Sequence, residues 1–278
     1  MKKSATGSTA IREWIQSTAR SGYGIDDIIA MMIDSGYTSR QARQWVAKVL
    51  DRPAVALDVD YQRNDGHRTR HPEPPALRVD GRSIEVSLCV EKPTIRVLEA
   101  LLDEGECDAL IELARPRLEH SLTVNTSGQQ TTDAKRTSRG MFFSLGETAL
   151  IERIEQRIAA LLDLPAEHGE GLQVLHYQPG QQYEPHYDWF DPTQLGFKGV
   201  TARSGQRIAS VIMYLNSPAG GGGTHFPNLG LTVSARRGSA LYFAYEGGDL
   251  ASLHAGLPVS AGEKWIATKW LRERPFSG

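Results

Sequence analysis

The chain has 278 residues, of which 40% are hydrophobic and 23% are charged, an ordinary globular composition. This length suits one large domain, with or without a small appendage, and the composition excludes fibrous, collagenous and wholly disordered proteins. The 31 Lys and Arg residues nearly balance the 33 Asp and Glu residues, for a net charge of −2. We therefore expect neither nucleic acid nor a membrane as a partner, because no global positive field would attract one.

The cysteines and the N-terminus predict a soluble, cytoplasmic protein. Cys89 and Cys107 are the only two cysteines and do not form a C-x-x-C pair, which favours a reducing compartment. The first ten residues carry two lysines but no apolar stretch of signal-peptide length. No window approaches the roughly 18 apolar residues of a membrane span. The sequence does not indicate an oligomeric state.

Residues 1–50 predict a small module of three helices, because apolar residues recur at helical spacing in three short stretches. The recurring residues are Ile11, Trp14 and Ile15; Ile25, Ile28, Ile29, Met32 and Ile33; and Ala42, Trp45, Val46 and Val49. The run from Met32 to Thr38 weakly resembles a three-helix module of the ubiquitin-associated type.

Residues 51–76 are predicted to be a linker, because four prolines interrupt a polar and charged run. His67 and His71 are four residues apart, a spacing that suits a metal on a helix. Here they lie among prolines and arginines, so the solvated-loop interpretation is favoured.

From residue 77 the pattern predicts an α+β fold. We expect helices over 94–102, 106–118 and 147–162. We expect strands over 84–90, 172–177, 182–186, 207–215, 231–233, 239–243 and 264–271. Gly and Pro separate these short strands, which favours a jelly roll, or double-stranded β-helix, with flanking helices over a parallel sheet.

His186 and Asp188 are candidate metal ligands, because residues two apart on a strand project from one face. A His-x-Asp pair alone is weak, and a strand-end histidine beside a solvated aspartate is the ordinary alternative. His254 precedes the last predicted strand, which a jelly roll can bring beside this pair. Two histidines and one carboxylate leave one face of a metal open, as in the facial triad of non-haem Fe(II) oxygenases.

Lys264 follows His254 by ten residues and begins the last predicted strand. A cation there suits the far carboxylate of an α-keto acid that chelates the metal. The alternative interpretation of Lys264 is an ordinary surface residue of the strand.

Several motifs, in order along residues 77–278, resemble the collagen-type prolyl 4-hydroxylases, which depend on 2-oxoglutarate and Fe(II). The motifs are Arg136-Thr-Ser-Arg-Gly140, Leu172 to Asp191, Gly205 to Asn216, Phe226 to Gly230, Ser252 to Gly256 and Gly262 to Trp270. This resemblance implies a double-stranded β-helix oxygenase core. It also implies a dioxygenase that hydroxylates a prolyl residue of a peptide or protein, with succinate and CO2 as co-products and L-ascorbate as the reductant.

The resemblance also implies a role for each candidate residue. His186, Asp188 and His254 would bind Fe(II), and Lys264 would complete the catalytic set. Lys264 and Tyr177 would hold the C5 carboxylate of 2-oxoglutarate, and Thr224 would line the same pocket. Tyr183, Arg207 and Trp270 would form the peptide groove. Without the resemblance, Tyr177, Tyr183 and Trp270 would more often be core aromatics.

Two alternatives remain open at this point. One is a hydroxylase of the same fold that acts on a free amino acid or another small molecule. The other is a non-catalytic jelly roll that binds Pro-rich peptides and holds Zn(II) or no metal. A halogenase of this fold is disfavoured, because Asp188 occupies the place where chloride would reach the iron.

Three segments bear on the substrate. Residues 125–138 and 189–205 are polar, contain glycine and lack a clear period, as expected of lids over a substrate. The family usually has Gly-Gly-Glu-Thr where this chain has Gly222-Gly-Thr-His225. His225 is expected beside the site or on the surface, since the three metal ligands are already supplied.

Overall fold

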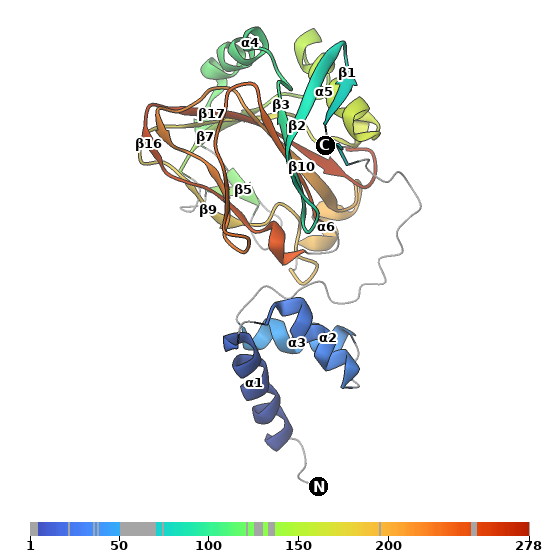
Figure 1. Cartoon of the computed structure of the whole chain (residues 1–278). Helices are drawn as coiled ribbons and strands as arrows, with labels where there is room; N and C mark the ends of the chain where they lie inside the picture. Colours follow the sequence, from blue (N-terminus) through green and yellow to red (C-terminus); the bar gives the residue numbers. More distant parts are fainter. Residues whose placement is uncertain are drawn as a thin grey trace. The chain divides into compact units, whose positions relative to one another are not determined.

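A computed structural model describes two compact units, one built mainly from the N-terminal helices and the other from the rest of the chain (Figure 1). The described residues are 5–21, 23–35, 37, 39–50, 71–73, 75–120, 122–124, 130–132, 137–194, 196–245 and 249–277. Most of the predicted linker, including His67, and most of the first predicted lid lie outside them. None of the helices described is both long enough and apolar enough to span a bilayer.

The N-terminal unit has three helices: α1 (Ala5–Arg20), α2 (Ile25–Asp34) and α3 (Ser39–Val49). One side of each helix contributes to a single apolar cluster, whose buried members are Ile15, Ile28, Ile29, Met32, Ala42 and Val46. Trp14 belongs to the same helical pattern in the sequence but is 40% exposed. The resemblance to a ubiquitin-associated module stays a prediction.

The second unit is built on a nine-stranded sheet (Figure 1). Its strands, in spatial order, are β1 (Ala76–Val79), β2 (Arg82–Val90), β3 (Thr94–Glu99), β14 (Ala240–Ala244), β10 (Arg207–Tyr214), β17 (Lys264–Arg272), β8 (Gln173–Tyr177), β7 (Arg139–Phe142) and β4 (Glu119–His120). Every strand pairing in the part of the chain that the structure describes is antiparallel. The antiparallel pairing agrees with the sequence pattern, which favoured a jelly roll over a parallel sheet.

A four-stranded sheet and two strand pairs accompany the large sheet. The smaller sheet has the order β13 (Leu231–Val233), β12 (Thr224–Phe226), β15 (His254–Gly256) and β9 (Tyr183–His186). The pairs are β11 (Gly220–Gly221) with β16 (Val259–Ala261), and β5 (Leu122–Val124) with β6 (Gln130–Thr132). The helices are α4 (Glu104–Ala114), α5 (Ala149–Leu162) and α6 (Phe197–Thr201), with short 3₁₀ turns at Arg115–Arg117, Ala166–His168 and Leu250–Ser252.

The large sheet is covered on both faces. On one face α4 and α5 pack through Leu110 and Ile158 onto sheet residues such as Val211 (Figure 1). The other face joins Ile212 of the large sheet to Phe226 of the small one in a second apolar cluster. This double coverage explains why all nine residues of β17 are buried. The space between the two sheets is where the candidate site lies.

One predicted element is wrong. Residues 94–102 were expected to be helical, but Thr94–Glu99 forms strand β3 between β2 and β14. Ile95 faces the second cluster and Leu98 the first, so both faces of this strand are buried. A short run of apolar residues buried on both faces lacks the alternation that marks a half-exposed strand, and its periodicity is ambiguous.

The described end of the predicted linker is fastened to the second unit. His71 Nδ1 lies 2.9 Å from the Tyr242 hydroxyl, and the Pro72 carbonyl accepts a 2.9 Å hydrogen bond from Arg96 Nε. The Arg96 side chain is almost fully buried. His71 lies in a loop as predicted, but it is half-buried against Tyr242 instead of fully solvated, and the second unit includes residues before the predicted boundary at 77.

We expect a shortened chain that starts at His71 to unfold at a higher temperature than one that starts at Ala76. The shorter chain loses the Pro72 acceptor and leaves a buried Arg96 donor unpaired, at a cost of about 2 kcal/mol. For a domain of this size that lowers the melting temperature by roughly 4–8 °C. Thermal unfolding followed by circular dichroism measures the difference. Equal melting temperatures would show that these contacts contribute no stability.

Candidate active site

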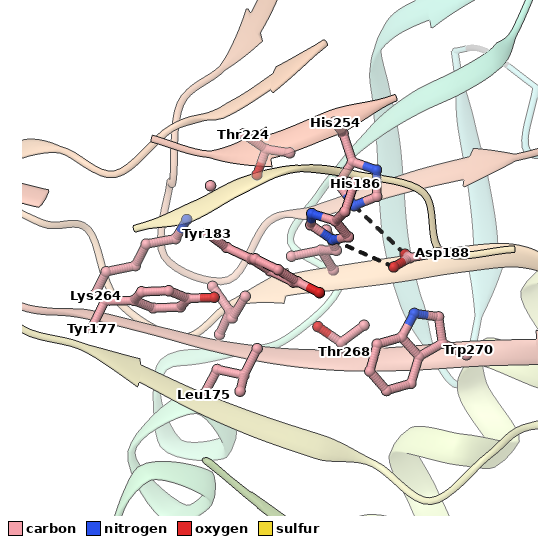
Figure 2. A pocket seen from close by; sticks show the side chains of 13 residues that line it. Leu175, Tyr177, Tyr183, His186, Asp188, Thr224, His254, Lys264, Thr268 and Trp270 are labelled. Carbon is pink, nitrogen blue, oxygen red and sulfur yellow. Dashed lines mark ion pairs between the residues drawn. The ribbon is translucent and has the colours of Figure 1, made fainter. Parts of the chain in front are cut away.

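A pocket opens to solvent between the two sheets (Figure 2), and the space in it, open solvent included, is about 410 Å³. Strands from both sheets supply its walls, so residues far apart in the sequence meet there. Its lining residues are Leu175, Tyr177, Tyr183, His186, Asp188, Ile212, Thr224, His254, Gly256, Lys264, Ile266, Thr268 and Trp270. Eight of the nine residues predicted for the site are in this set, and Arg207 is the exception.

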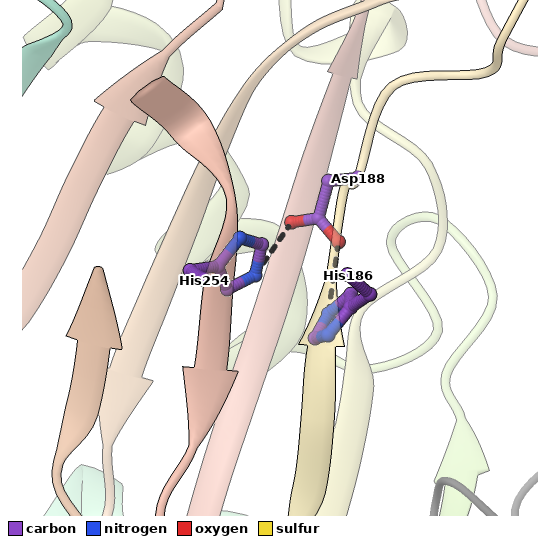
Figure 3. A group of neighbouring side chains, drawn as sticks. All are labelled: His186, Asp188 and His254. Atoms are coloured by element: carbon purple, nitrogen blue, oxygen red, sulfur yellow. Dashed lines mark ion pairs between the residues drawn. The ribbon is translucent and has the colours of Figure 1, made fainter. Parts of the chain in front are cut away.

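The three predicted metal ligands converge (Figure 3). Strand β15 pairs with β9 so that His254 lies opposite His186, and Asp188 follows just beyond β9. The Asp188 carboxylate oxygens lie 3.6 Å from His186 Nε2 and 3.6 Å from His254 Nε2. The potential ligand atoms of all three residues lie within 4.8 Å of one another.

In their neutral form, which is the form that binds a metal, both histidines present an unprotonated Nε2 to this point. His186 Nδ1 lies 2.8 Å from the Glu184 carbonyl oxygen and His254 Nδ1 lies 3.0 Å from the Ser252 carbonyl oxygen. A carbonyl oxygen only accepts, so in each neutral ring Nδ1 carries the proton and Nε2 keeps its lone pair. Carbonyl partners of this kind orient histidine ligands in metal sites.

Asp188 is held in its ionised form. Burial by itself raises the pKa of this carboxyl, but the charges of protonated His254 and His186 and of Arg207, together with the Ser210 hydrogen bond, outweigh burial and lower the pKa to about 2. A carboxylate and two imidazole nitrogens on one side of a point suit a divalent first-row metal such as Fe(II) and leave its other positions open. The donor set therefore fits the predicted iron.

Lys264 marks the other end of the pocket (Figure 2). It pairs with Tyr177 across β17 and β8, and its ammonium lies 5.4 Å from the centre of the Tyr177 ring. Burial lowers its pKa from 10.5 to about 8, and no acidic side chain of the described residues forms an ion pair with it. Thr224 lies on β12 of the facing small sheet, and its hydroxyl is 2.8 Å from the Tyr214 hydroxyl of the large sheet.

Two glycines leave space beside the Lys264 side chain. A Cβ at Gly256 would lie 4.0 Å from Lys264 Nζ and 3.6 Å from Tyr183. A Cβ at Gly222, whose φ is +70°, would lie 3.2 Å from Lys264 Cδ. A buried cation without an acidic partner, with space kept open beside it, suits a bound anion. The residues present therefore fit the far carboxylate of an α-keto diacid.

The predicted groove aromatics line the pocket. The Tyr183 ring stacks on the His186 ring, with ring centres 3.6 Å apart. Trp270 lies near Asp188 (Figure 2) and is 7% exposed. The indole Nε1 of Trp270 has no hydrogen-bond partner in the described chain. Both rings therefore belong to the pocket wall as well as to the core.

Arg207 lies behind the pocket. Its Nε and Nη2 each donate a 2.7 Å hydrogen bond to the Glu170 carboxylate, and its Nη1 donates to the Asp188 carbonyl at 3.2 Å. The guanidinium also lies 3.9 Å from the centre of the Trp270 ring. Three of its nitrogens thus support the pocket wall, and donation to a peptide stays a prediction.

Three further residues support the site and were not predicted from the sequence: Glu170, Ser210 and Tyr245. Arg272 Nη1 also donates to Glu170, at 2.9 Å, and the Ser210 hydroxyl donates to Asp188 Oδ2 at 2.6 Å. A usable signal existed for Ser210, because it shares a strand face with the pocket residue Ile212. Glu170 and Tyr245 follow no such pattern.

His225 and the second predicted lid lie outside the pocket lining. His225 Nδ1 is 2.9 Å from the Thr232 hydroxyl, across β12 and β13. Arg272 and Arg274 donate to the carbonyls of Val200 and Thr201, at the end of α6. These bonds fasten one part of 189–205, and its role as a lid stays a prediction.

Comparisons with known proteins agree with this chemistry. Residues 172–272 match the family model of the 2OG-Fe(II) oxygenase superfamily. Probable prolyl 4-hydroxylase 10 of Arabidopsis thaliana is 41% identical over 209 residues, which cover 66% of this chain and 71% of the relative. Prolyl 4-hydroxylase 1 of the same plant is 40% identical over 205 residues, which cover 66% and 71%.

A solved structure supports the same assignment. The viral collagen prolyl hydroxylase of Paramecium bursaria Chlorella virus-1, in its 2OG complex, is 29% identical with a TM-score of 0.51. The match covers 64% of this chain and 95% of the viral protein. The converging histidines and aspartate, the buried lysine and these relatives all lead to one assignment. The chain belongs to the prolyl 4-hydroxylase family of the 2OG-Fe(II) oxygenase superfamily, and it is a 2-oxoglutarate-dependent dioxygenase.

Proposed function

We propose that this protein hydroxylates a prolyl residue of a peptide or protein, forming succinate and CO2 from 2-oxoglutarate and O2. The observation that carries the proposal is one pocket with the His186, Asp188 and His254 group at one end and, at the other, a buried lysine that forms no ion pair with any acidic side chain among the described residues. L-Ascorbate is the proposed reductant that keeps the iron as Fe(II). We also propose that the two facing sheets form a double-stranded β-helix and that the enzyme acts in the cytoplasm.

The two ends of the pocket have different roles: one end binds the metal and the other binds the far carboxylate of 2-oxoglutarate. Bound Fe(II), with 2-oxoglutarate as its co-substrate, supplies the activation of O2 that an unactivated C–H bond requires. His186, Asp188 and His254 hold the metal through two nitrogens and one oxygen. Lys264 neutralises the far carboxylate of 2-oxoglutarate, and Thr224 and Tyr177 shape the space around it.

A proline fits the remaining wall of the pocket. Tyr183 and Trp270 are pocket-lining aromatic residues (Figure 2), and aromatic rings pack well on a pyrrolidine ring. Relatives named prolyl 4-hydroxylases at 40–41% identity support the same substrate class. Residues 1–50 are proposed as a separate module that takes no part in the chemistry.

Trp270→Phe is expected to raise the KM for a proline-containing peptide about 3–10-fold, because the smaller ring loses part of its contact with the substrate. Decarboxylation of 2-oxoglutarate without peptide should stay within about twofold of wild type, since the variant removes neither a metal ligand nor Lys264 and keeps an aromatic ring beside Arg207. Succinate and hydroxyproline are measured separately in one assay.

Trp265→Phe is the matched control. Trp265 lies on the same strand but packs in the apolar cluster beneath α4 and α5, outside the pocket lining, so this variant should keep the wild-type KM for the peptide. Hydroxylation of a free amino acid, but of no proline-containing peptide, would overturn the proposed substrate class. Absence of Fe(II)-dependent consumption of 2-oxoglutarate in wild type would overturn the catalytic proposal.

A further inference from the structure

The Asp188 carboxylate is hydrogen-bonded unequally on its two oxygens. Ser210 Oγ lies 2.6 Å from Oδ2. The Tyr245 hydroxyl lies 3.0 Å from Ser210 Oγ. All three groups are buried, with Ser210 at 0%, Tyr245 at 2% and Asp188 at 7% exposure. A chain of hydrogen bonds therefore runs from Tyr245 through Ser210 to a metal ligand.

The chemistry of the three groups fixes the direction of this chain. An ionised carboxylate only accepts, and a serine hydroxyl has a single proton to donate. Ser210 therefore gives its proton to Asp188 Oδ2. Its oxygen can then only accept from Tyr245, whose phenol must be the donor. Each hydroxyl has one role, and the hydrogen bonds link the phenol to Asp188 through Ser210.

Strand geometry sets the two hydroxyls in place. Ser210 lies on β10, where it pairs with Phe243 of β14 and Trp270 of β17. Tyr245 follows directly after β14, and its amide donates to the Ile208 carbonyl at 3.1 Å. Both residues come from the large sheet, whereas His186 and His254 come from the small one. Asp188 is thus held from the sheet opposite its two histidine neighbours.

We propose that Ser210 and Tyr245 are positioning residues that fix the rotation of the Asp188 carboxylate for metal binding. Because Ser210 occupies Oδ2, Oδ1 is the oxygen with more lone-pair capacity left for a metal. Arg207 holds the Asp188 backbone through its 3.2 Å bond to the carbonyl, and the serine and tyrosine hold the side chain. This inference rests on the metal site of the proposed function.

The test is binding of Mn(II), a divalent stand-in for Fe(II) that does not oxidise in air, to the full-length protein. Ser210→Ala should raise the Kd for Mn(II) roughly 10–100-fold, the usual effect of removing a partner of a metal ligand. Tyr245→Phe removes only the terminal donor and should raise the Kd about 3–10-fold. The visible absorption of the Co(II)-loaded protein should also shift in Ser210→Ala, which a purely structural role would not cause.

Tyr242→Phe is the matched control. Tyr242 is equally buried on β14, and its hydroxyl contacts His71 instead of the Asp188 chain. The loss of one buried hydroxyl should lower the melting temperature of both tyrosine variants, but only Tyr245→Phe should change the Kd for Mn(II). An equal rise of the Kd in Tyr242→Phe would overturn the proposal, because the effect would then come from lost stability.

The Kd of the double variant Ser210→Ala/Tyr245→Phe for Mn(II) shows whether Tyr245 acts on Asp188 through Ser210 or whether the two residues act independently. If Tyr245 acts only through Ser210, the double variant binds Mn(II) within about twofold of Ser210→Ala. If the rise in the Kd of the double variant equals the product of the rises in the two single variants, Tyr245 does not act through Ser210 and this part of the proposal is overturned. Failure of wild type to bind Mn(II) would refute the metal site and with it the proposed function. Wild-type affinity in both single variants would refute only the positioning role.

Discussion

Alanine at His186, Asp188 or His254 is expected to reduce Fe(II)- and 2-oxoglutarate-dependent turnover to background. Each substitution removes one of three ligand atoms that lie within 4.8 Å of one another, and two remaining ligands hold the metal weakly and misplace its open positions. The loss should exceed the roughly 10–100-fold cost of removing a hydrogen-bond partner outside the ligand set. Succinate formation and the Kd for Mn(II) measure the two effects.

His225→Ala is the control for these variants. His225 is a histidine of the same small sheet, but it lies outside the pocket lining and contacts Thr232. We expect wild-type turnover and wild-type Mn(II) affinity from this variant. Near-wild-type turnover in any of the three ligand variants would show that the metal site is wrongly assigned.

Lys264→Ala is expected to raise the KM for 2-oxoglutarate roughly 10–100-fold, with little change in the affinity for Mn(II). A charge-assisted hydrogen bond of this kind contributes on the order of 1.5–3 kcal/mol to binding. Lys264→Met keeps most of the side-chain length and removes only the charge, so a similar rise there would show that the charge is responsible. An unchanged KM in both variants would refute the role of Lys264.

The pKa of Lys264 gives this role a pH dependence. Burial lowers that pKa to about 8, so the ammonium is present at pH 7 and is lost as the pH rises above 8. The Kd for 2-oxoglutarate should therefore rise up to about tenfold per pH unit above pH 8 in wild type. In Lys264→Met it should not vary with pH over the same range.

Stability of the protein without 2-oxoglutarate should respond in the opposite direction. The Lys264 pKa is lower in the folded protein than the ordinary lysine value of 10.5, so the unfolded chain binds more protons between about pH 8 and 10.5. The contribution of Lys264 to the free energy of unfolding therefore rises with pH in this window and is smallest below pH 8. Above pH 8 the affinity for 2-oxoglutarate should fall while the contribution of Lys264 to the free energy of unfolding rises. A general loss of structure at high pH would lower both quantities.

Local patterns were enough to locate the chemistry of this site. His186 and Asp188 lie two residues apart at the end of a strand, so their proximity follows from strand geometry alone. Their meeting with His254 needed the pairing of β15 with β9, which the motif order suggested through a resemblance. The helix predicted over 147–162 is α5, because its apolar stripe and the Thr148 cap are both local features.

The tertiary structure decided the elements whose surroundings lie far away in the sequence. Residues 94–99 became a strand because β2 and β14 lie on either side and both faces are buried. The half-buried position of His71 depends on Tyr242, 171 residues later. The strands beside residues 94–99 and the Tyr242 hydroxyl beside His71 do not affect the local hydrophobic periodicity. A short window of sequence therefore could not predict these contacts.

The sequence by itself determined which ligand atoms this protein carries and their order along the chain. Only the tertiary structure decided which residues hold those atoms in place. Arg207 donates hydrogen bonds to the Glu170 carboxylate and to the Asp188 carbonyl, and Ser210 donates one to the Asp188 carboxylate. The physical reason is that a ligand is recognised by its chemical type, whereas a supporting residue is defined by its distance from the ligand. Distances between β10, β14 and the end of β9 exist only once the two sheets have packed together.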